Sequence, residues 1–106
     1  MKKTNSKSVA QPYVVVRASA AGVHAGYLVS RDGDTVELRN ARRLYRWVVA
    51  RMSGQLASLS EVAVYGLETK DERSRIGVTV TKQTVLGVCE VLAVEEQAQL
   101  SIEGAP

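Results

Sequence analysis

Apolar positions along the chain fall into short runs, and their spacing predicts strands more often than helices. The segment from Tyr13 to Arg17 is β-branched and apolar, which is typical of a buried strand. Ile76, Val78 and Val80 alternate with small or polar residues and predict a strand buried on one face. The segment from Leu86 to Val94 is almost continuously apolar, which predicts a strand buried on both faces.

An Asp-Gly pair predicts a hairpin in the first half of the chain. The pair stands at positions 32 and 33, between two alternating segments at residues 23–30 and 35–39. An Asp-Gly turn between alternating segments is a strong hairpin signal, because these residues accept the positive φ angles of the turn. In the second segment we expect Val36 and Leu38 to face the core and the residues that follow each of them to point outward.

Two segments carry the signals of short helices. Ser58-Leu59-Ser60-Glu61 has the spacing of a capping box, so a helix is predicted from Leu59 to Leu67, with Gly66 near its C-terminal end. Glu95 to Ile102 predicts a final helix that is acidic at its N-terminus, where the helix dipole favours negative charge. Gly104 stands just past its end.

The arginine-rich segment from Arg39 to Trp47 fits either a helix or a strand. A helix places three apolar residues on one face: Leu44, Val48 and Met52. A strand places on one face Arg43, Tyr45 and Trp47, and on the other Arg42, Leu44, Arg46 and Val48. Because the segment follows directly on the predicted hairpin, we favour a strand through about Trp47 and a less regular or helical passage to Leu56.

These elements add up to five or six strands and two or three short helices. Gly22 and Gly26 lie inside a strand region and indicate sharp bending, as small barrels require. We therefore expect an α+β fold, a small β-rich barrel or sandwich with two or three short helices. Residues 12–106 are expected to form a single globular domain. Met1 to Gln11, polar and rich in lysine, is expected to be a disordered basic tail.

The net charge of +3 belongs to this tail. Met1 to Gln11 contains three lysines and no acidic residue, so 11 of the 14 basic residues remain in residues 12–106 and balance the 11 acidic residues there. Within that remainder the charges are segregated, because arginines cluster in the middle while four glutamates follow the last basic residue, Lys82. Such polarisation could steer an anion to one face, or bring the basic face of one subunit to the acidic end of another.

The segment from Arg39 to Trp47 carries the most specific chemistry of the chain. It holds four arginines, a tyrosine and the only tryptophan, and no acidic residue stands between Glu37 and Glu61. Guanidinium groups match phosphate geometry and stack on flat rings, so this composition indicates a phosphorylated, ring-bearing ligand. The candidate ligand-binding residues are Arg17, His24, Arg39, Arg42, Arg43, Tyr45, Arg46 and Trp47.

Each candidate also has a plainer interpretation. The arginines could form a solvated face or pair with the glutamates between Glu90 and Glu103. Trp47 is more often a core residue than a stacking platform, and His24, among small residues, is more often structural. Cys89 is the only cysteine and is expected in the core, so one chain can form no internal disulfide. With one histidine and one cysteine, a single subunit cannot assemble a Cys/His zinc site, and no metal is expected.

The sequence motifs give little support to catalysis, a cofactor or a membrane. The chain has no phosphate-binding P-loop, dinucleotide-binding glycine motif, H-E-x-x-H motif or G-x-S-x-G elbow, and we expect no enzyme and no cofactor. No apolar run approaches the roughly 18 to 20 residues of a membrane span. Met1 to Gln11 also lacks the apolar core of a secretion signal, so we expect a cytoplasmic protein without a membrane partner.

Four short motifs resemble those of an uncharacterised family of small proteins encoded by bacteriophages and prophages. The motifs are Tyr13 to Arg17, Ala21 to Gly26, Asn40 to Leu44 with Trp47, and Ser58 to Ala63. The similarity extends from Tyr13 to about Ile102. One departure is the segment from Val48 to Ala57, which is longer than the brief linker usual in the family, and Met1 to Gln11 has no clear counterpart.

The resemblance implies a non-catalytic phage accessory protein, and several classes of these are oligomeric sponges that sequester nucleotide immune signals. On this basis we expect a counter-defence protein that acts in the cytoplasm of the bacterial host. It would be a homo-oligomer that binds a phosphorylated small molecule or nucleotide, a cyclic one included, in a pocket between protomers. Direct binding of DNA or RNA through the tail lysines and central arginines is the main alternative. A further alternative is that the protein inhibits a host protein by binding to it.

Overall fold

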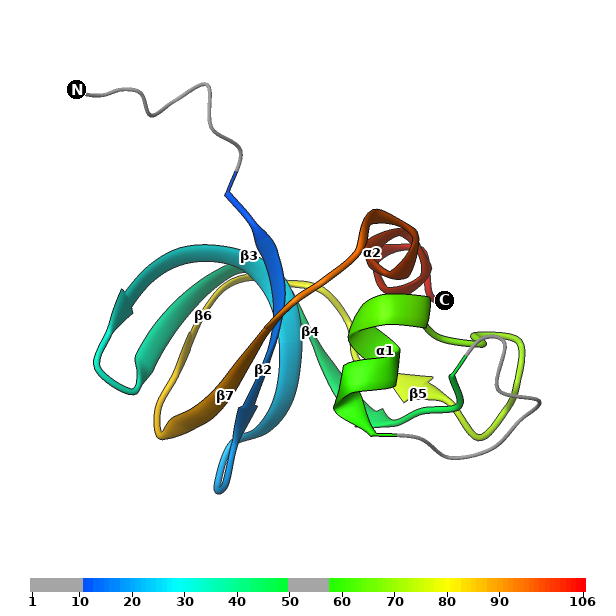
Figure 1. Ribbon diagram of the computed structural model, residues 1–106, viewed down its shortest axis with the longest axis horizontal. Helices are drawn as coiled ribbons and strands as arrows, with labels where there is room; N and C mark the ends of the chain where they lie inside the picture. Colours follow the sequence, from blue (N-terminus) through cyan, green and yellow to red (C-terminus); the bar gives the residue numbers. More distant parts are fainter. Residues whose placement is uncertain (1–10, 50–57) are drawn as a thin grey trace.

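The computed structural model describes residues 11–49 and 58–106, which form one curled antiparallel sheet and two short helices (Figure 1). The strands are β2 Tyr13–Ala18, β3 Gly22–Asp32, β4 Thr35–Arg46, β5 Arg75–Ile76, β6 Val80–Val85 and β7 Val88–Ala93. The helices are α1 Leu59–Tyr65 and α2 Glu96–Glu103. The expected α+β class is confirmed. The predicted tail, apart from Gln11, and the predicted passage from residue 50 to Leu56 lie outside the described residues.

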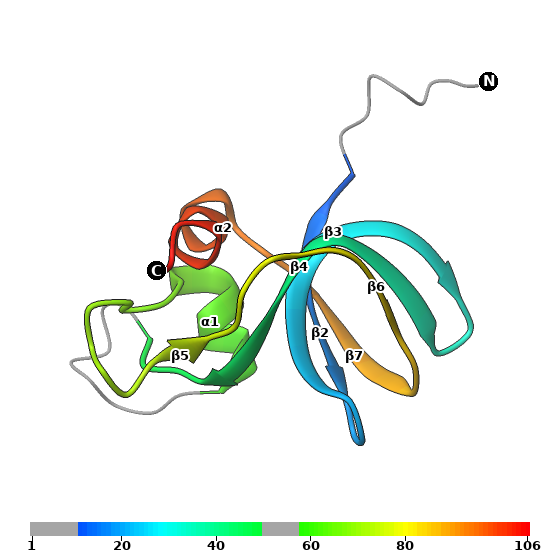
Figure 2. The same ribbon diagram turned by 180° about the vertical axis from the view of Figure 1, so that it is seen from behind.

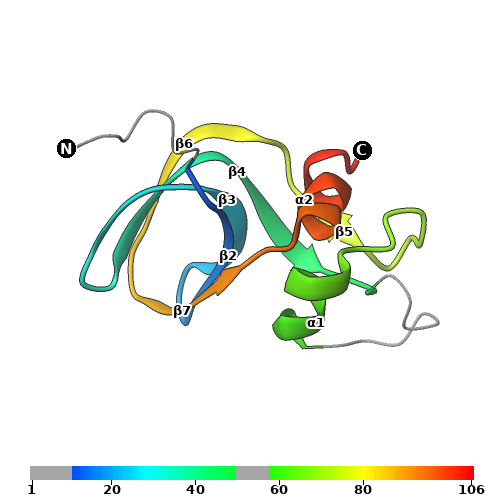
Figure 3. The same cartoon turned by 45° about the horizontal axis from the view of Figure 1, so that its top comes forward.

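The sheet is open, and the expectation of a barrel or sandwich is corrected to a single curled sheet. The strand order is β5-β4-β3-β2-β7, and β6 also pairs with β4. Although β6 and β7 follow each other along the chain, β6 is hydrogen-bonded to β4 and β7 to β2. Figure 3 shows the resulting curl. A barrel requires a ladder between its first and last strands, and among the described strands β6 and β7 do not form one.

The first strand and the hairpin are confirmed. β2 begins at Tyr13 as predicted, and β3 and β4 are joined by a turn in which Gly33 has a φ of 60°. Val36 and Leu38 are fully buried, and Arg39 is exposed. The alternation of apolar and polar residues therefore determined which side chains of β4 enter the core.

The edge strand beside β4 is interrupted where the sequence predicted a continuous strand. Ala41 pairs with Val80 and Leu44 pairs with Ile76, so three residues on the edge lie opposite two on β4. The extra residue leaves the sheet, and Val78 is 80% exposed instead of half-buried. The predicted continuous strand from Ile76 to Val80 is therefore wrong, because β5 ends at Ile76 and β6 begins only at Val80.

The junction of β6 and β7 also differs from the prediction. The apolar run was expected to form a strand from Leu86, but β7 begins at Val88. Gly87 has a φ of 73° and turns the chain, which leaves Leu86 63% exposed. The predicted strand is thus confirmed only for its part within β7. The expected burial on both faces is wrong, because only Val88 of this strand is buried, and Cys89, expected in the core, is exposed.

The two faces of the sheet support two hydrophobic cores. The core between the sheet and the helices contains Tyr13, Val15, Ala25, Leu44, Val49, Leu59, Val62, Leu67 and Ile102. The core inside the curl contains Val14, Val16, Ala18, Val36, Leu38, Ala41, Val85 and Val88. β2 contributes to both because successive side chains of a strand point to opposite faces.

Both helices lie on the same side of the sheet and begin and end close to the predicted positions. The main-chain N–H of Ser58 donates to the Glu61 carboxylate (2.9 Å), as expected of a capping box. α1 ends earlier than predicted because Gly66, with a φ of 87°, forms its C-cap. Gly104 caps α2 as predicted. Neither described helix is long and apolar enough to cross a membrane.

Candidate functional site

Strand β4 distributes the arginine segment over both faces of the sheet. Arg42 and Leu44 are buried, and Leu44 belongs to the core beneath the helices. Arg43 and Tyr45 alternate with them, are exposed and point to the opposite face. The predicted strand is confirmed here, and neighbouring arginines consequently have different environments.

Arg42 is 6% exposed, and its guanidinium binds main-chain carbonyls on two segments. Its Nε donates to the oxygen of Gly77 at 2.7 Å, and its Nη1 donates to the oxygens of Ile102 and Ala105 at 2.9 and 2.7 Å. Longer bonds of 3.3 and 3.4 Å reach two further carbonyls of the same C-terminal segment. A cation at a helix C-terminus also complements the helix dipole. Arg42 therefore anchors the end of α2, and we exclude it from the surface offered to a ligand.

Arg43, Tyr45, Arg46 and Arg75 form an exposed group on β4 and β5, the arginine–tyrosine cluster. The Tyr45 ring is at its centre and is 54% exposed. The Cζ atom of Arg43 lies 5.4 Å from the ring centroid, and that of Arg75 lies 5.2 Å from it. Arg46 is the Cα partner of Arg75 across the two strands. The guanidinium groups of Arg43 and Arg75 are thus within the reach of cation–π contacts with one aromatic ring, and Arg46 joins the cluster only through its pairing with Arg75.

The cluster is not neutralised by carboxylates. Within residues 11–49 and 58–106, the ion pairs join other cations, such as Arg17 to Glu90 at 3.2 Å. None includes an arginine of the cluster. Like charges directly opposite each other in a sheet are destabilising, so the pairing of Arg46 with Arg75 has an electrostatic cost that a bound anion would reduce.

Two glycines permit the close packing around the cluster. A Cβ atom on Gly22 would lie 2.9 Å from Nη2 of Arg43, and one on Gly77 would lie 3.3 Å from Cε2 of Tyr45. The N–H of Gly77 donates to the oxygen of Arg43 at 2.7 Å, while its carbonyl is bound by Arg42. Gly77 therefore connects the buried anchor with the exposed cluster.

His24 is a buried neighbour of the cluster. It is the cross-strand partner of Arg43 but is only 2% exposed. Its Nε2 donates to the oxygen of Ala21 at 2.8 Å, and its Nδ1 has no hydrogen-bond partner in the described structure. Burial lowers the pKa of His24 below its usual 6.5, and the charge of Arg43 lowers it further. His24 is therefore neutral at pH 7, and its position supports the structural interpretation.

Three other predicted site residues are not part of the cluster. Arg39 lies over the ring of Tyr27, with its Cζ 4.7 Å from the ring centroid, and Tyr27 packs against the core beneath the helices. Trp47 is half-buried against the same core. Arg17 pairs with Glu90, as the plainer interpretation of the arginines allowed. The structure thus brings together only Arg43, Tyr45 and Arg46 of the predicted set.

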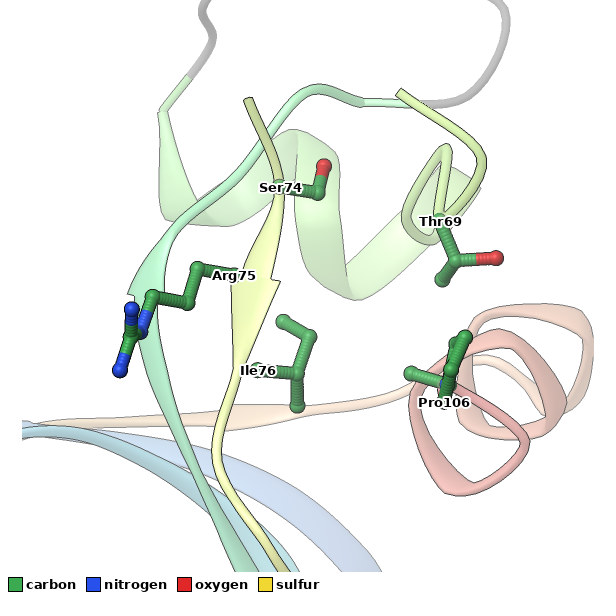
Figure 4. A pocket seen from close by; sticks show the side chains of 6 residues that line it. Thr69, Ser74, Arg75, Ile76 and Pro106 are labelled. Carbon is green, nitrogen blue, oxygen red and sulfur yellow. The ribbon is translucent and has the colours of Figure 1, made fainter. Parts of the chain in front are cut away.

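A hollow of about 250 Å³ lies on the other side of β5. It is lined by Thr69, Ser74, Arg75, Ile76, Ala105 and Pro106. Figure 4 shows the side chain of Ile76 directed into it, whereas the guanidinium of Arg75 points away. The hollow is therefore separate from the arginine–tyrosine cluster. No group of three or more His, Cys, Asp or Glu side chains that could hold a metal occurs in the described parts of the chain.

Arg75 is the site residue that the sequence reasoning missed. It follows a charged loop and lies far along the chain from the arginine segment. Its inclusion depends on the pairing of β5 with β4, a contact between distant segments that has no local sequence signal.

Comparison with known proteins gives a family without an assigned activity. A family model described as a domain of unknown function (DUF6948) matches residues 11–102, so the chain belongs to this family. No curated protein and no solved structure matches the chain.

Proposed function

We propose that this member of the DUF6948 family is a non-catalytic protein that binds a phosphorylated, ring-bearing ligand of the nucleotide class at the arginine–tyrosine cluster. The observation that carries the proposal is the exposed Tyr45 ring between guanidinium groups that no carboxylate of the described residues neutralises. Guanidinium groups bind phosphate oxygens, and an exposed aromatic ring accepts a stacked base. Arg43, Arg46 and Arg75 are the phosphate-binding candidates.

The energies of these contacts, summed before the cost of immobilising the ligand, are of the size that micromolar affinity requires. A hydrogen bond to a charged group contributes about 1.5 to 3 kcal/mol net, so three guanidinium contacts contribute about 4.5 to 9 kcal/mol. Stacking on Tyr45 adds about 1 to 3 kcal/mol per base. A dissociation constant of about 1 μM corresponds to about −8 kcal/mol, whereas about 1 nM requires about −12 kcal/mol. Nanomolar binding would therefore draw on further groups, which a second protomer could supply.

Titration calorimetry with a panel of cyclic and linear nucleotides tests this proposal. Arg43→Ala and Arg75→Ala are each expected to raise the dissociation constant about tenfold or more, because each removes a charge-assisted contact. Arg31→Ala is the matched control, since it removes an exposed arginine from the end of β3 and should leave binding unchanged. Failure of the wild-type protein to bind any nucleotide, or an equal loss in the control, would contradict the proposal.

Single-stranded nucleic acid is the second candidate, and the exposure of Tyr45 on a strand favours it. Proteins that bind single strands combine a cationic surface with aromatic side chains on which bases stack. Such binding weakens steeply with salt because counterions are released. Deletion of residues 1–11 removes three lysines and is expected to weaken nucleic-acid binding strongly, while nucleotide binding at the cluster should persist.

The biological role follows from the sequence resemblance and forms part of the proposal. We propose that the protein acts in the bacterial cytoplasm as an oligomer that sequesters a nucleotide signal of the host, as phage counter-defence proteins do. The measurement is to purify the protein from cells that produce such signals, denature it and identify the released small molecules by mass spectrometry. If nucleotides bind in calorimetry but none is recovered from the cells, the sequestering role is refuted and the binding proposal stands.

A further inference from the structure

An acidic and partly apolar surface lies on the outer side of α2. Glu95, Glu96, Gln97 and Leu100 line a hollow of about 380 Å³. Both glutamates are exposed, and neither forms an ion pair within the described residues. Leu100 is 64% exposed. We call these four residues the α2 surface.

The arginine–tyrosine cluster has the complementary composition. It carries three arginines without carboxylate partners in the described structure, and Tyr45 presents an exposed ring among them. Val78 leaves the sheet at the interruption between β5 and β6 and is the most exposed of the large apolar side chains described. Each surface therefore combines unpaired charge of one sign with apolar area, a combination suited to a protein contact.

The two surfaces of one chain cannot meet. α1 and α2 cover the face of the sheet toward which Leu44 points, whereas Tyr45 points to the opposite face. Figure 2, seen from behind, shows β5 in front of α1. The sheet thus separates the arginine–tyrosine cluster from the α2 surface, and their charges can be matched only between molecules.

We infer that the arginine–tyrosine cluster of one copy docks on the α2 surface of a second copy. Arg43 and Arg75 are the candidates to pair with Glu95 and Glu96, while Val78 and Leu100 supply apolar area. The contact joins two different surfaces, so its repetition generates a ring or a chain instead of a two-fold dimer. This inference does not rest on the proposed ligand, although both use the same arginines.

Analytical ultracentrifugation of the full chain tests the inference. The weight-average mass is expected to rise with protein concentration in about 50 mM sodium chloride and to return toward the monomer in about 500 mM, since salt screens exposed charges. The double substitution Glu95→Lys with Glu96→Lys is expected to raise the dissociation constant about tenfold or more. The double substitution Arg43→Glu with Arg75→Glu should have the same effect.

The two charge-reversed variants also test each other. Each alone should be monomeric, and an equimolar mixture should associate again, because its opposite charges are restored across the contact. Asp32→Lys with Asp34→Lys is the matched control for the Glu95→Lys, Glu96→Lys variant, because it makes the same change in net charge beside the β3–β4 turn and should leave association intact. Circular dichroism verifies that each variant is folded.

The outcomes separate this inference from the proposed function. A wild-type protein that stays monomeric in low salt, or a mixture that fails to associate, overturns the docking inference. Calorimetry on the Glu95→Lys, Glu96→Lys variant then shows whether the ligand site is independent, because this variant keeps every residue of the arginine–tyrosine cluster. Nucleotide binding by the wild-type protein without association would refute only the docking. Association of the wild-type protein, together with no nucleotide binding by the non-associating Glu95→Lys, Glu96→Lys variant, would refute only the ligand.

Discussion

Replacement of Arg42 by alanine is expected to be the most damaging single change among the arginines of β4. The side chain makes three short bonds to carbonyls of Gly77, Ile102 and Ala105. At about 1.5 to 3 kcal/mol for each bond to a charged donor, these amount to about 4.5 to 9 kcal/mol. Desolvation of the buried, charged guanidinium costs several kcal/mol in the wild-type protein, which offsets part of this sum. We therefore expect Arg42→Ala to lower the free energy of unfolding by about 3 to 5 kcal/mol.

That loss is a large fraction of the roughly 5 to 15 kcal/mol by which domains of this size are stable. Urea unfolding followed by circular dichroism and by Trp47 fluorescence measures it. Arg42→Lys keeps the charge but not the planar fork, so it should lose about half as much. Arg43→Ala, one residue away and exposed, is the control and should change the free energy by no more than about 0.5 kcal/mol. A loss below about 1 kcal/mol for Arg42→Ala would refute the anchoring role.

Three further predictions concern single residues near the two cores and the cluster. Because burial lowers the folded pKa of His24 below 6.5, protonation favours the unfolded chain, and the free energy of unfolding should fall as the pH drops below about 6.5. In urea unfolding at a series of pH values, His24→Gln should make the free energy of unfolding depend less on pH below about 6.5. An unchanged pH dependence would mean that other groups cause it. Gly66→Ala adds a Cβ 2.6 Å from a serine hydroxyl of α2 at a φ of 87°, whereas Gly87→Ala adds one to open space at 73°. In thermal unfolding, Gly87→Ala should lower the free energy of unfolding by about 1 to 2 kcal/mol, and Gly66→Ala should lower it by at least about 1 kcal/mol more. Equal losses would mean that the close contact between the new Cβ and the serine hydroxyl relaxes without cost. Gly77→Ala would place a Cβ 3.3 Å from Cε2 of Tyr45, so the ring should shift slightly and nucleotide affinity should fall severalfold in calorimetry. Unchanged affinity would mean that this shift does not affect binding.

The elements that sequence reasoning predicted correctly are those whose signals are local. β2, the β3–β4 hairpin and both helices depend on alternation, turn residues and caps, which lie within a few positions of each other. The interruption between β5 and β6 could not be predicted in this way. It depends on how many residues of the edge lie opposite Ala41 to Leu44, which is a property of the pairing between distant segments.

The candidate site was predicted in part for the same reason. Strand alternation separates Arg42 from Arg43, but two identical side chains give no indication of which one is buried. The main-chain oxygens that bind the Arg42 side chain, and so determine that it is the buried one, belong to residues up to 64 positions further along the chain. Arg75 joins the cluster through β5, and Arg39 is drawn to Tyr27 on the other face. Sequence composition thus indicated the chemistry of the site, while tertiary contacts selected its members.

The position of β2 has a consequence for how the protein is made. β2 leaves the ribosome just before β3, and the pairing of the two strands can follow at once. Its second partner, β7, is synthesised only after β6, although Val16 pairs with Val91. Until then the apolar residues that β2 contributes to both cores remain partly uncovered, and incomplete chains have an exposed strand edge. Chains truncated before β7 should therefore aggregate during expression, even though they contain most of the sheet.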